Sequence, residues 1–296
     1  MNEIVIETKG LEKRFGKTEA VCGIDLKVPK GSVYAFLGRN GAGKSTTIKM
    51  LMGLLEPEAG SATVLGLRSQ AETLEIKQRT GYVPESPVLY RWMKVREFLR
   101  FVSAFFPKWD RPYADELLAH FQLKPDQKVG TLSKGMAAKL ALTVGLAHRP
   151  ELLILDDPTM GLDVIVRREF LESIVSVIQE EGRTVFLSTH QIDEAERVAD
   201  HIGIIHDGKL LWQSSLEALK NSVRRVHLAV DETFRGLEGI DGVLSEEREE
   251  RRWTGVLEGL DEAKLARLKS LPGVAALEAL HMPLEDIFCA LAGGRS

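Results

Sequence analysis

A glycine-rich segment, Gly-Arg-Asn-Gly-Ala-Gly-Lys-Ser-Thr, occupies residues 38–46 and restricts the chain to a small group of folds. An apolar run at residues 33–37 precedes it and predicts a buried strand, and apolar residues at helical spacing follow it. A loop at this junction directs backbone N–H groups and the positive end of a helix dipole at one point, where a phosphate can bind. The alternative is a glycine-rich turn without a ligand. The order of strand, loop and helix favours a phosphate-binding loop.

The spacing Gly-x-x-x-x-Gly-Lys-Ser assigns chemistry to single residues of the loop. Lys44 would reach the β- and γ-phosphates of a nucleotide, and the Ser45 hydroxyl would be a ligand of Mg²⁺. The residues of this segment that we expect to contact the nucleotide are Gly38, Asn40, Gly41, Ala42, Gly43, Lys44, Ser45 and Thr46.

A second buried strand, at residues 152–155, ends in the pair Asp156 and Asp157. In α/β sheets ligands bind at the carboxyl ends of the strands, so both carboxylates are predicted to lie beside the phosphate-binding loop. Asp156 would hold Mg²⁺ directly or through water. Asp157 would polarise an attacking water. The alternative is a strand that ends in a solvated acidic turn.

Composition and patterning exclude several classes of protein. The chain has 39 Lys and Arg against 43 Asp and Glu, so it lacks the positive field that binds nucleic acid non-specifically. Its two cysteines are too few for a disulfide framework or a zinc site, and a reducing, cytosolic setting is expected. Apolar runs fall well short of the roughly 20 residues of a membrane span, and the N-terminus does not resemble a signal peptide. Any membrane spans would have to come from another chain.

Over about residues 3–215 the sequence resembles the ATP-binding subunits of ABC transporters. The matching motifs occur in the family's order: Phe15-Gly16, Walker A at Gly38–Thr46, the Q-loop region Gly81–Glu85, the signature Leu132–Met136, Walker B at Leu152–Asp157, the D-loop Gly161–Asp163 and the switch segment Ser188–His190. The two Walker motifs alone indicate only a P-loop NTPase. The signature and D-loop motifs make the resemblance specific.

The resemblance implies the ligands ATP and Mg²⁺ and further site residues. Phe15 would stack on adenine, and the alternative is a partly buried core aromatic. His190 would bond the γ-phosphate or the attacking water, and Glu85 would be a further oxygen ligand of Mg²⁺. The implied catalytic residues are Asp157, His190, Glu85 and Lys44, and the implied metal ligands are Ser45, Glu85 and Asp156.

Three further positions are implied to bind ATP: Ser133, Gly135 and Asp163. The helix N-terminus at Ser133 would bind the γ-phosphate of ATP held by a second subunit. Ser133 begins a predicted helix, where its ordinary role is an N-cap, and one helix end can serve both purposes. Lys134 and Met136 depart from the usual glycine and glutamine of the signature. The Lys134 side chain either adds positive charge near the γ-phosphate or faces solvent.

The departure with the largest expected consequence is Asp157, where the family usually has glutamate. Aspartate is one methylene shorter, so its carboxylate sits roughly 1.5 Å further back. A misplacement of about 1 Å can cost on the order of 100-fold in rate. We expect intact ATP binding and reduced turnover, unless a backbone shift restores the reach. Glu85, in place of the usual Q-loop glutamine, is typical of a branch of exporter ATPases.

The predicted fold class is α/β, a P-loop NTPase of ABC type with a mixed sheet core, an antiparallel β edge and a helical subdomain at about 87–150. The predicted domains are 1–219 for ATP binding and 220–296 for a small α+β appendage. In the appendage, strands are expected at 226–230, 253–257 and 274–280, with a helix at 260–271. The stretch 246–252 is densely charged.

Tyr82–Glu85, the start of the signature and the run Met282–Phe288 resemble the ABC-2-type exporter and drug-resistance branch. The resemblance implies an ATPase on the inner face of the cell membrane, where ATP-dependent dimerisation would power separate polytopic membrane subunits. The dimer would be a homodimer or a heterodimer with a second ABC ATPase. The alternatives are a soluble ABC ATPase acting on ribosomes or DNA, and a regulatory subunit with slow turnover. Candidate contacts with the membrane subunit are Leu89, Tyr90, Trp92 and Met93, which could instead pack in the helical core.

Overall fold

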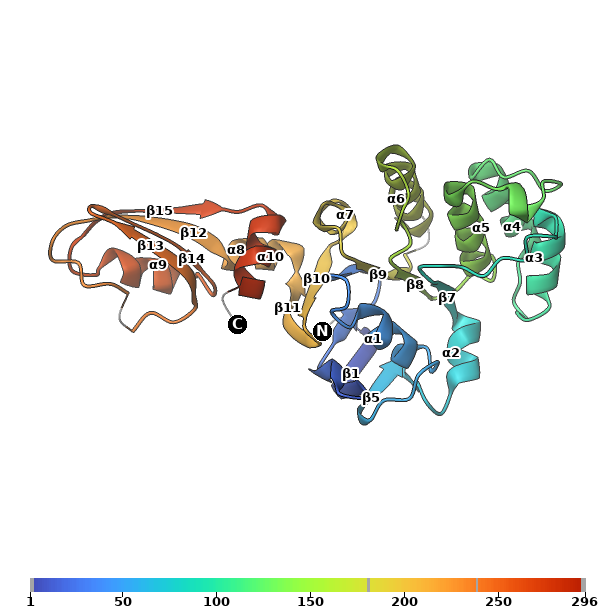
Figure 1. Cartoon of the computed structure of the whole chain (residues 1–296), viewed down its shortest axis with the longest axis horizontal. Helices are drawn as coiled ribbons and strands as arrows, with labels where there is room; N and C mark the ends of the chain where they lie inside the picture. Colours follow the sequence, from blue (N-terminus) through green and yellow to red (C-terminus); the bar gives the residue numbers. More distant parts are fainter. Residues whose placement is uncertain (1–2, 180–181, 238, 294–296) are drawn as a thin grey trace. The chain divides into compact units, whose positions relative to one another are not determined.

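The computed structural model of the chain describes residues 3–179, 182–237 and 239–293 (Figure 1). It divides the chain into two compact units, Met1–Gln213 and Ser214–Ser296. The first unit contains both Walker motifs, and the second contains the predicted α+β appendage. In the described part of the chain, no helix has the length and hydropathy needed to cross a lipid bilayer.

A six-stranded sheet forms the centre of the first unit, in the order β11-β10-β4-β9-β8-β7. Its strands are β4 (Val33–Leu37), β7 (Thr80–Val83), β8 (Leu152–Asp156), β9 (Thr184–Thr189), β10 (His201–His206) and β11 (Lys209–Ser215). The neighbours from β10 to β7 pair in parallel. Every residue of β8 and β9 is buried, which is typical of a parallel sheet covered on both faces. A hairpin turn at Asp207-Gly208, with φ angles of 45° and 75°, connects β10 and β11.

A second, antiparallel sheet supports the helix that follows the glycine-rich loop. Its strands are β1 (Ile4–Phe15), β2 (Thr18–Ile24), β3 (Lys27–Pro29), β5 (Ala59–Val64) and β6 (Leu67–Arg68), followed by helix α2 (Thr73–Arg79). Helix α1 (Lys44–Leu51) buries Ile48 and Leu51 in one hydrophobic cluster with Leu11 of β1 and Ile154 of β8. Both sheets therefore fix the position of α1, and with it the loop at its N-terminus.

The predicted helical subdomain lies between β7 and β8 in the sequence. Its elements are α3 (Val95–Ser103), α4 (Arg111–His120), a 3₁₀ turn at Val129–Thr131 and α5 (Lys134–Leu146). Two further helices follow β8 and β9: α6 (Val164–Gln179) and α7 (Ile192–Val198). Phe98, Leu117 and Leu140 pack in one buried cluster that also includes Leu153 and Leu155 of β8. This cluster attaches the helices to β8, the strand that ends in Asp156.

In its described residues, the second unit is an antiparallel sheet in the order β13-β14-β12-β15 with three helices. Its elements are α8 (Leu216–Ser222), β12 (Arg224–Val230), β13 (Val243–Glu249), β14 (Arg252–Leu257), α9 (Glu262–Lys269), β15 (Val274–His281) and α10 (Leu284–Gly293). The three predicted strands and the predicted helix are present. The sequence does not predict β13, because this edge strand is mostly charged and exposed. The Nε1 of buried Trp253 donates to Glu246 of β13 at 2.8 Å, which ties this strand to β14. The predicted fold class is confirmed.

A buried histidine follows α5 and makes the stability of the first unit depend on pH. His148 is only 2% exposed and stacks on Phe106, with ring centroids 4.2 Å apart. Burial lowers its pKa to about 4, against about 6.5 in an unfolded chain. Between these values the unfolded chain binds a proton that the folded chain does not, so stability is complete above pH 6.5 and falls as the pH decreases.

We therefore expect wild-type protein to lose about 2 kcal/mol more stability between pH 7.5 and pH 5 than a His148→Phe variant does. Urea unfolding at the two pH values measures this difference. The phenylalanine ring keeps the stacking on Phe106 and removes the titrating group. Equal losses in the two proteins would show that His148 does not cause the pH dependence.

Candidate functional site

Backbone atoms from other segments of the chain pack closely against the glycine-rich loop. A Cβ on Gly38 would lie 2.5 Å from the carbonyl oxygen of Ile205, and a Cβ on Gly43 would collide with the carbonyl of Ala20. Gly43 also has φ 106°, a conformation that favours glycine. These contacts explain why glycine stands at both ends of the loop. They also place the N-terminus of α1 at the carboxyl end of β4.

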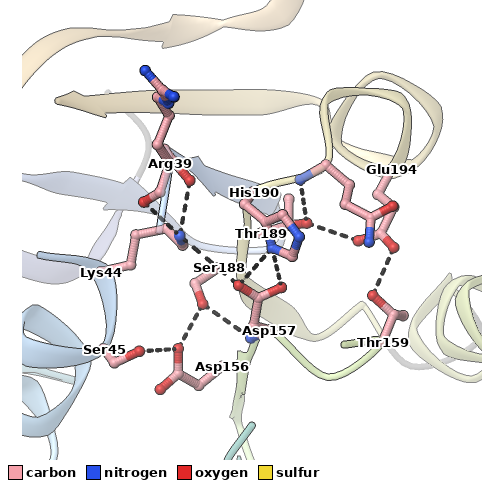
Figure 2. Close-up of polar contacts among 12 residues, drawn as sticks. Arg39, Lys44, Ser45, Asp156, Asp157, Thr159, Ser188, Thr189, His190 and Glu194 are labelled. Carbon is pink, nitrogen blue, oxygen red and sulfur yellow. Dashed lines mark hydrogen bonds and ion pairs between the residues drawn. The ribbon is translucent and has the colours of Figure 1, made fainter. Parts of the chain in front are cut away.

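Lys44 is 6% exposed and folds back over the loop that precedes it (Figure 2). Its Nζ donates to the carbonyl oxygens of Gly38 at 2.8 Å and Arg39 at 3.2 Å, and lies 3.8 Å from Asp157 Oδ2. Burial lowers the pKa of Lys44, and the nearby carboxylates, Asp157 foremost, oppose that effect. An anionic group bound in the loop would further favour the charged ammonium.

Ser45 and Asp156 form the oxygen pair expected for a divalent cation. The Ser45 hydroxyl donates to Asp156 Oδ1 at 3.0 Å, and the Ser188 hydroxyl donates to the same oxygen at 2.7 Å. Burial raises the pKa of Asp156, and the bonds from Ser188 and Ser45 counteract this. Adjacent ligands of octahedral Mg²⁺ are about 3 Å apart, which matches the spacing of the Ser45 and Asp156 oxygens. The residues present fit Mg²⁺.

Asp157 and His190 form a pair at the carboxyl ends of β8 and β9. The Nδ1 of His190 lies 2.9 and 3.0 Å from the two carboxylate oxygens of Asp157. The Asp157 N–H donates to the Ser188 hydroxyl at 3.0 Å. Asp157 has φ 48°, a left-handed conformation that aspartate adopts more readily than most residues. The fold thus holds this carboxylate between Lys44 and His190.

Two pockets are lined in part by residues of the loop. One, of about 340 Å³, is lined by Ala20, Asn40, Gly41, Gly43, Lys44, Ser45, Thr46, Glu85, Asp157 and Met160. The other, of about 530 Å³, is lined by Arg39, Asn40, Ala42, His190, His206 and Asp207. These linings, together with the bonds from Ser45 to Asp156 and from Lys44 to Gly38, show that the structure brings together the predicted loop residues, Glu85, both aspartates and His190.

The other predicted site residues lie outside both pockets. Phe15 is 52% exposed at the end of β1, with Lys13 Nζ 5.8 Å from its ring centroid, so it is not a core aromatic. Ser133 caps α5 by accepting from the Met136 N–H at 3.2 Å. Asp163 accepts from the N–H groups of residues 165 and 166 at the start of α6.

The structure also shows the surroundings of two signature residues, Gly135 and Lys134. Gly135 is buried, and a Cβ there would lie 2.5 Å from Val166 Cγ1, so α5 and α6 approach closely at this point. The exposed Lys134 side chain extends over Gly161 of the D-loop of the same chain, where an added Cβ would collide with Nζ. The lysine therefore contacts the D-loop segment.

Several polar residues of the site were not predicted. Ser188 bonds to Asp156 and Asp157, and Glu194 bonds to Thr159 and Thr189 (Figure 2). The sequence signal for Ser188 is the run Ser188-Thr189-His190, whose two hydroxyl residues precede the predicted histidine. Nothing in the local spacing of Glu194 indicates that its carboxylate is buried beside this run.

Known proteins are similar to this chain in sequence and in fold. Residues 21–160 match the ABC transporter family model. The chain is 39% identical over 223 residues to the bacitracin transport ATP-binding protein BcrA of Bacillus licheniformis, covering 75% of this chain and 73% of that protein. It is 34% identical to the Nod factor export ATP-binding protein I of Burkholderia orbicola, covering 99% of this chain and 98% of that protein.

Among solved structures, an ATP-binding subunit of an ABC transporter superposes with a TM-score of 0.66 and 30% sequence identity, covering 73% of this chain and 92% of that chain. The family match includes Walker A and ends just after Walker B, and the match to the Nod factor protein extends over nearly the whole sequence. The chain therefore belongs to the ABC transporter family, as one of its ATP-binding subunits.

Proposed function

We propose that this chain hydrolyses ATP to power export through separate polytopic membrane subunits, on the inner face of the cell membrane. The observation that carries the proposal is the convergence of Lys44, Ser45 with Asp156, and the Asp157–His190 pair on one loop. The printed names of the bacitracin transport and Nod factor export relatives support the direction of transport.

In this proposal the phosphates of ATP occupy the 340 Å³ pocket, where Lys44 and the loop N–H groups bind them. Asp157 accepts a proton from water as the water oxygen attacks the γ-phosphorus. The bond to the bridging oxygen then breaks, and ADP leaves with that oxygen. His190 orients the Asp157 carboxylate. Mg²⁺, held by Ser45, Asp156 and Glu85, would neutralise charge on the phosphates.

The same proposal includes dimerisation. Ser133 and Gly135 at the start of α5, together with Asp163, would contact ATP held by a second ATPase subunit, and Phe15 would stack on adenine. These residues lie outside both pockets of the single chain, which is compatible with a site completed by a partner. The partner would be a second copy or a different ABC ATPase.

An exposed aromatic surface provides a docking site for the membrane subunit. It consists of the exposed side chains of Tyr90, Trp92, Phe101 and Phe105, whose rings lie next to one another. Tyr90 contacts the Phe101 ring edge-on at 5.3 Å, and Trp92 is 73% exposed. Of the four candidates from the sequence, Leu89 and Met93 instead pack against the helical cluster. Large exposed aromatics are enriched at protein interfaces and carry much of the binding energy.

Purification of the native complex in mild detergent tests the proposal. We expect a polytopic membrane protein to co-purify in a defined ratio. Loss of an interface tryptophan costs at least about 2 kcal/mol, so Trp92→Ala is expected to weaken this association by roughly 30-fold. Leu54→Ala is the matched control, because Leu54 is exposed in the turn that follows α1 and lies outside the aromatic surface.

Three outcomes would count against the proposal. Ribosomes or DNA-repair proteins in place of a membrane protein would indicate a soluble ABC ATPase. Equal association of both variants would remove the aromatic surface as the docking site. A stable transporter complex without measurable ATP turnover would indicate a regulatory subunit.

A further inference from the structure

A buried carboxylate on α7 connects two segments of the catalytic region. Glu194 is 3% exposed, and each of its oxygens accepts one hydroxyl hydrogen bond (Figure 2). Thr159 Oγ1 donates to Oε1 at 2.6 Å, and Thr189 Oγ1 donates to Oε2 at 2.8 Å. Both threonines are fully buried. Hydroxyl bonds to a carboxylate are short and strong, particularly where water is excluded.

The two threonines adjoin the residues that would perform the chemistry. Thr159 stands two residues after Asp157, and Thr189 directly precedes His190. One carboxylate therefore ties together the turn after β8 and the end of β9, the two segments whose Asp157 and His190 side chains meet at 2.9 Å. The Gln191 N–H also donates to Thr189 Oγ1 at 3.0 Å, which extends the network past His190.

The network also reaches the D-loop through Arg167 of α6. Arg167 Nε lies 3.5 Å from Glu194 Oε1, and Arg167 Nη2 donates to the carbonyl oxygen of Leu162 at 3.2 Å. A further bond joins Arg167 to the side chain of Gln191. Glu194 and Arg167 thus link the D-loop, the turn after Asp157 and the segment that carries His190.

We propose that Glu194 is a positioning residue for ATP hydrolysis, which fixes the spacing of Asp157 and His190 through Thr159 and Thr189. The inference rests on the proposed function, since it concerns the same site. The polar contacts that the structure describes for Glu194 go to Thr159, Thr189 and Arg167, and none of them goes to the phosphate-binding loop. Its loss therefore lowers kcat and leaves nucleotide affinity unchanged.

Paired substitutions at Thr159 separate a hydroxyl role from a packing role. Thr159→Val keeps the shape and removes the donor, whereas Thr159→Ser keeps the donor and removes a methyl group. We expect Thr159→Val to lower kcat by about 10- to 100-fold, with KM and the dissociation constant for ATP within about twofold of wild type. Thr159→Ser is expected to retain most of the turnover. The opposite order, serine worse than valine, would indicate packing and overturn the inference.

Comparing Thr189→Val with Thr189→Ser gives a second measurement if Thr159→Val does not fold. Glu194→Gln combined with Thr159→Val should lower kcat by less than the product of the single effects, because both act on one network. Thr143→Val is the matched control, since Thr143 is a fully buried threonine whose hydroxyl bonds within α5. Its kcat should equal that of wild type.

The wild-type rate separates the two proposals. A wild-type protein without ATP turnover in its native complex would refute the proposed function, and this inference with it. A wild-type protein that turns over ATP at the same kcat as both valine variants would refute the role of Glu194 alone.

Discussion

An Asp157→Asn variant is expected to hydrolyse ATP at least about 100-fold more slowly than wild type, because the amide cannot accept the proton of the attacking water. Its affinity for ATP should be equal or higher, since a negative charge 3.8 Å from Lys44 is removed from the phosphate pocket. Steady-state phosphate release and equilibrium nucleotide binding measure the two quantities. Asp200→Asn is the matched control, because Asp200 contacts His201 Nδ1 at the same 2.9 Å but on the surface.

The complementary Asp157→Glu variant tests whether the length of the side chain at this position limits the rate of ATP hydrolysis. The extra methylene advances the carboxylate by roughly 1.5 Å, and we expect turnover to rise by about 10- to 100-fold. Glutamate is less tolerant than aspartate of the φ of 48°, so thermal unfolding must show that the variant is folded. A folded variant with unchanged or lower turnover would show that Asp157 already reaches its working position.

The second large effect is expected at Lys44. Lys44→Ala removes a buried ammonium that would pair with the phosphates, which costs about 2–5 kcal/mol, so ATP affinity should fall by at least roughly 30-fold and turnover should be lost. Lys49→Ala on the exposed face of the same helix is the control and should bind ATP normally. Calorimetric titration with ATP under non-hydrolysing conditions compares the two. Equal affinities would exclude the loop as the phosphate site.

The strand, loop and helix around residues 38–46 could be predicted because their pattern is local. Neighbouring residues determine where β4 ends and where α1 begins. Asp156 was predictable for the same reason, since it terminates an apolar run. The resemblance to ABC transporter subunits then supplied the order of the remaining motifs, and the family match agrees with it.

What could not be predicted depends on contacts between distant segments. Glu194 resembles any other carboxylate on a polar helix face until β8 and β9 bring Thr159 and Thr189 to it. Strand β13 carries too little apolar alternation to be distinguished from a charged loop, because it lies at the edge of its sheet. Leu89 and Trp92 differ in burial although they are close in sequence, since the tertiary packing decides which side chain faces the core.

The bonds that converge on Asp156 have a consequence for the synthesis of the chain. The Ser45 bond spans 111 residues and the Ser188 bond spans 32, so both form only after β8 and β9 have joined the parallel sheet. Non-local pairings of this kind are late and slow events in folding. A nascent chain shorter than about 190 residues therefore contains the whole glycine-rich loop, but its Ser45 and Asp156 oxygens are not yet in their final positions. ATP then binds preferentially to molecules that have finished folding, and by mass action it stabilises the folded state in the cell.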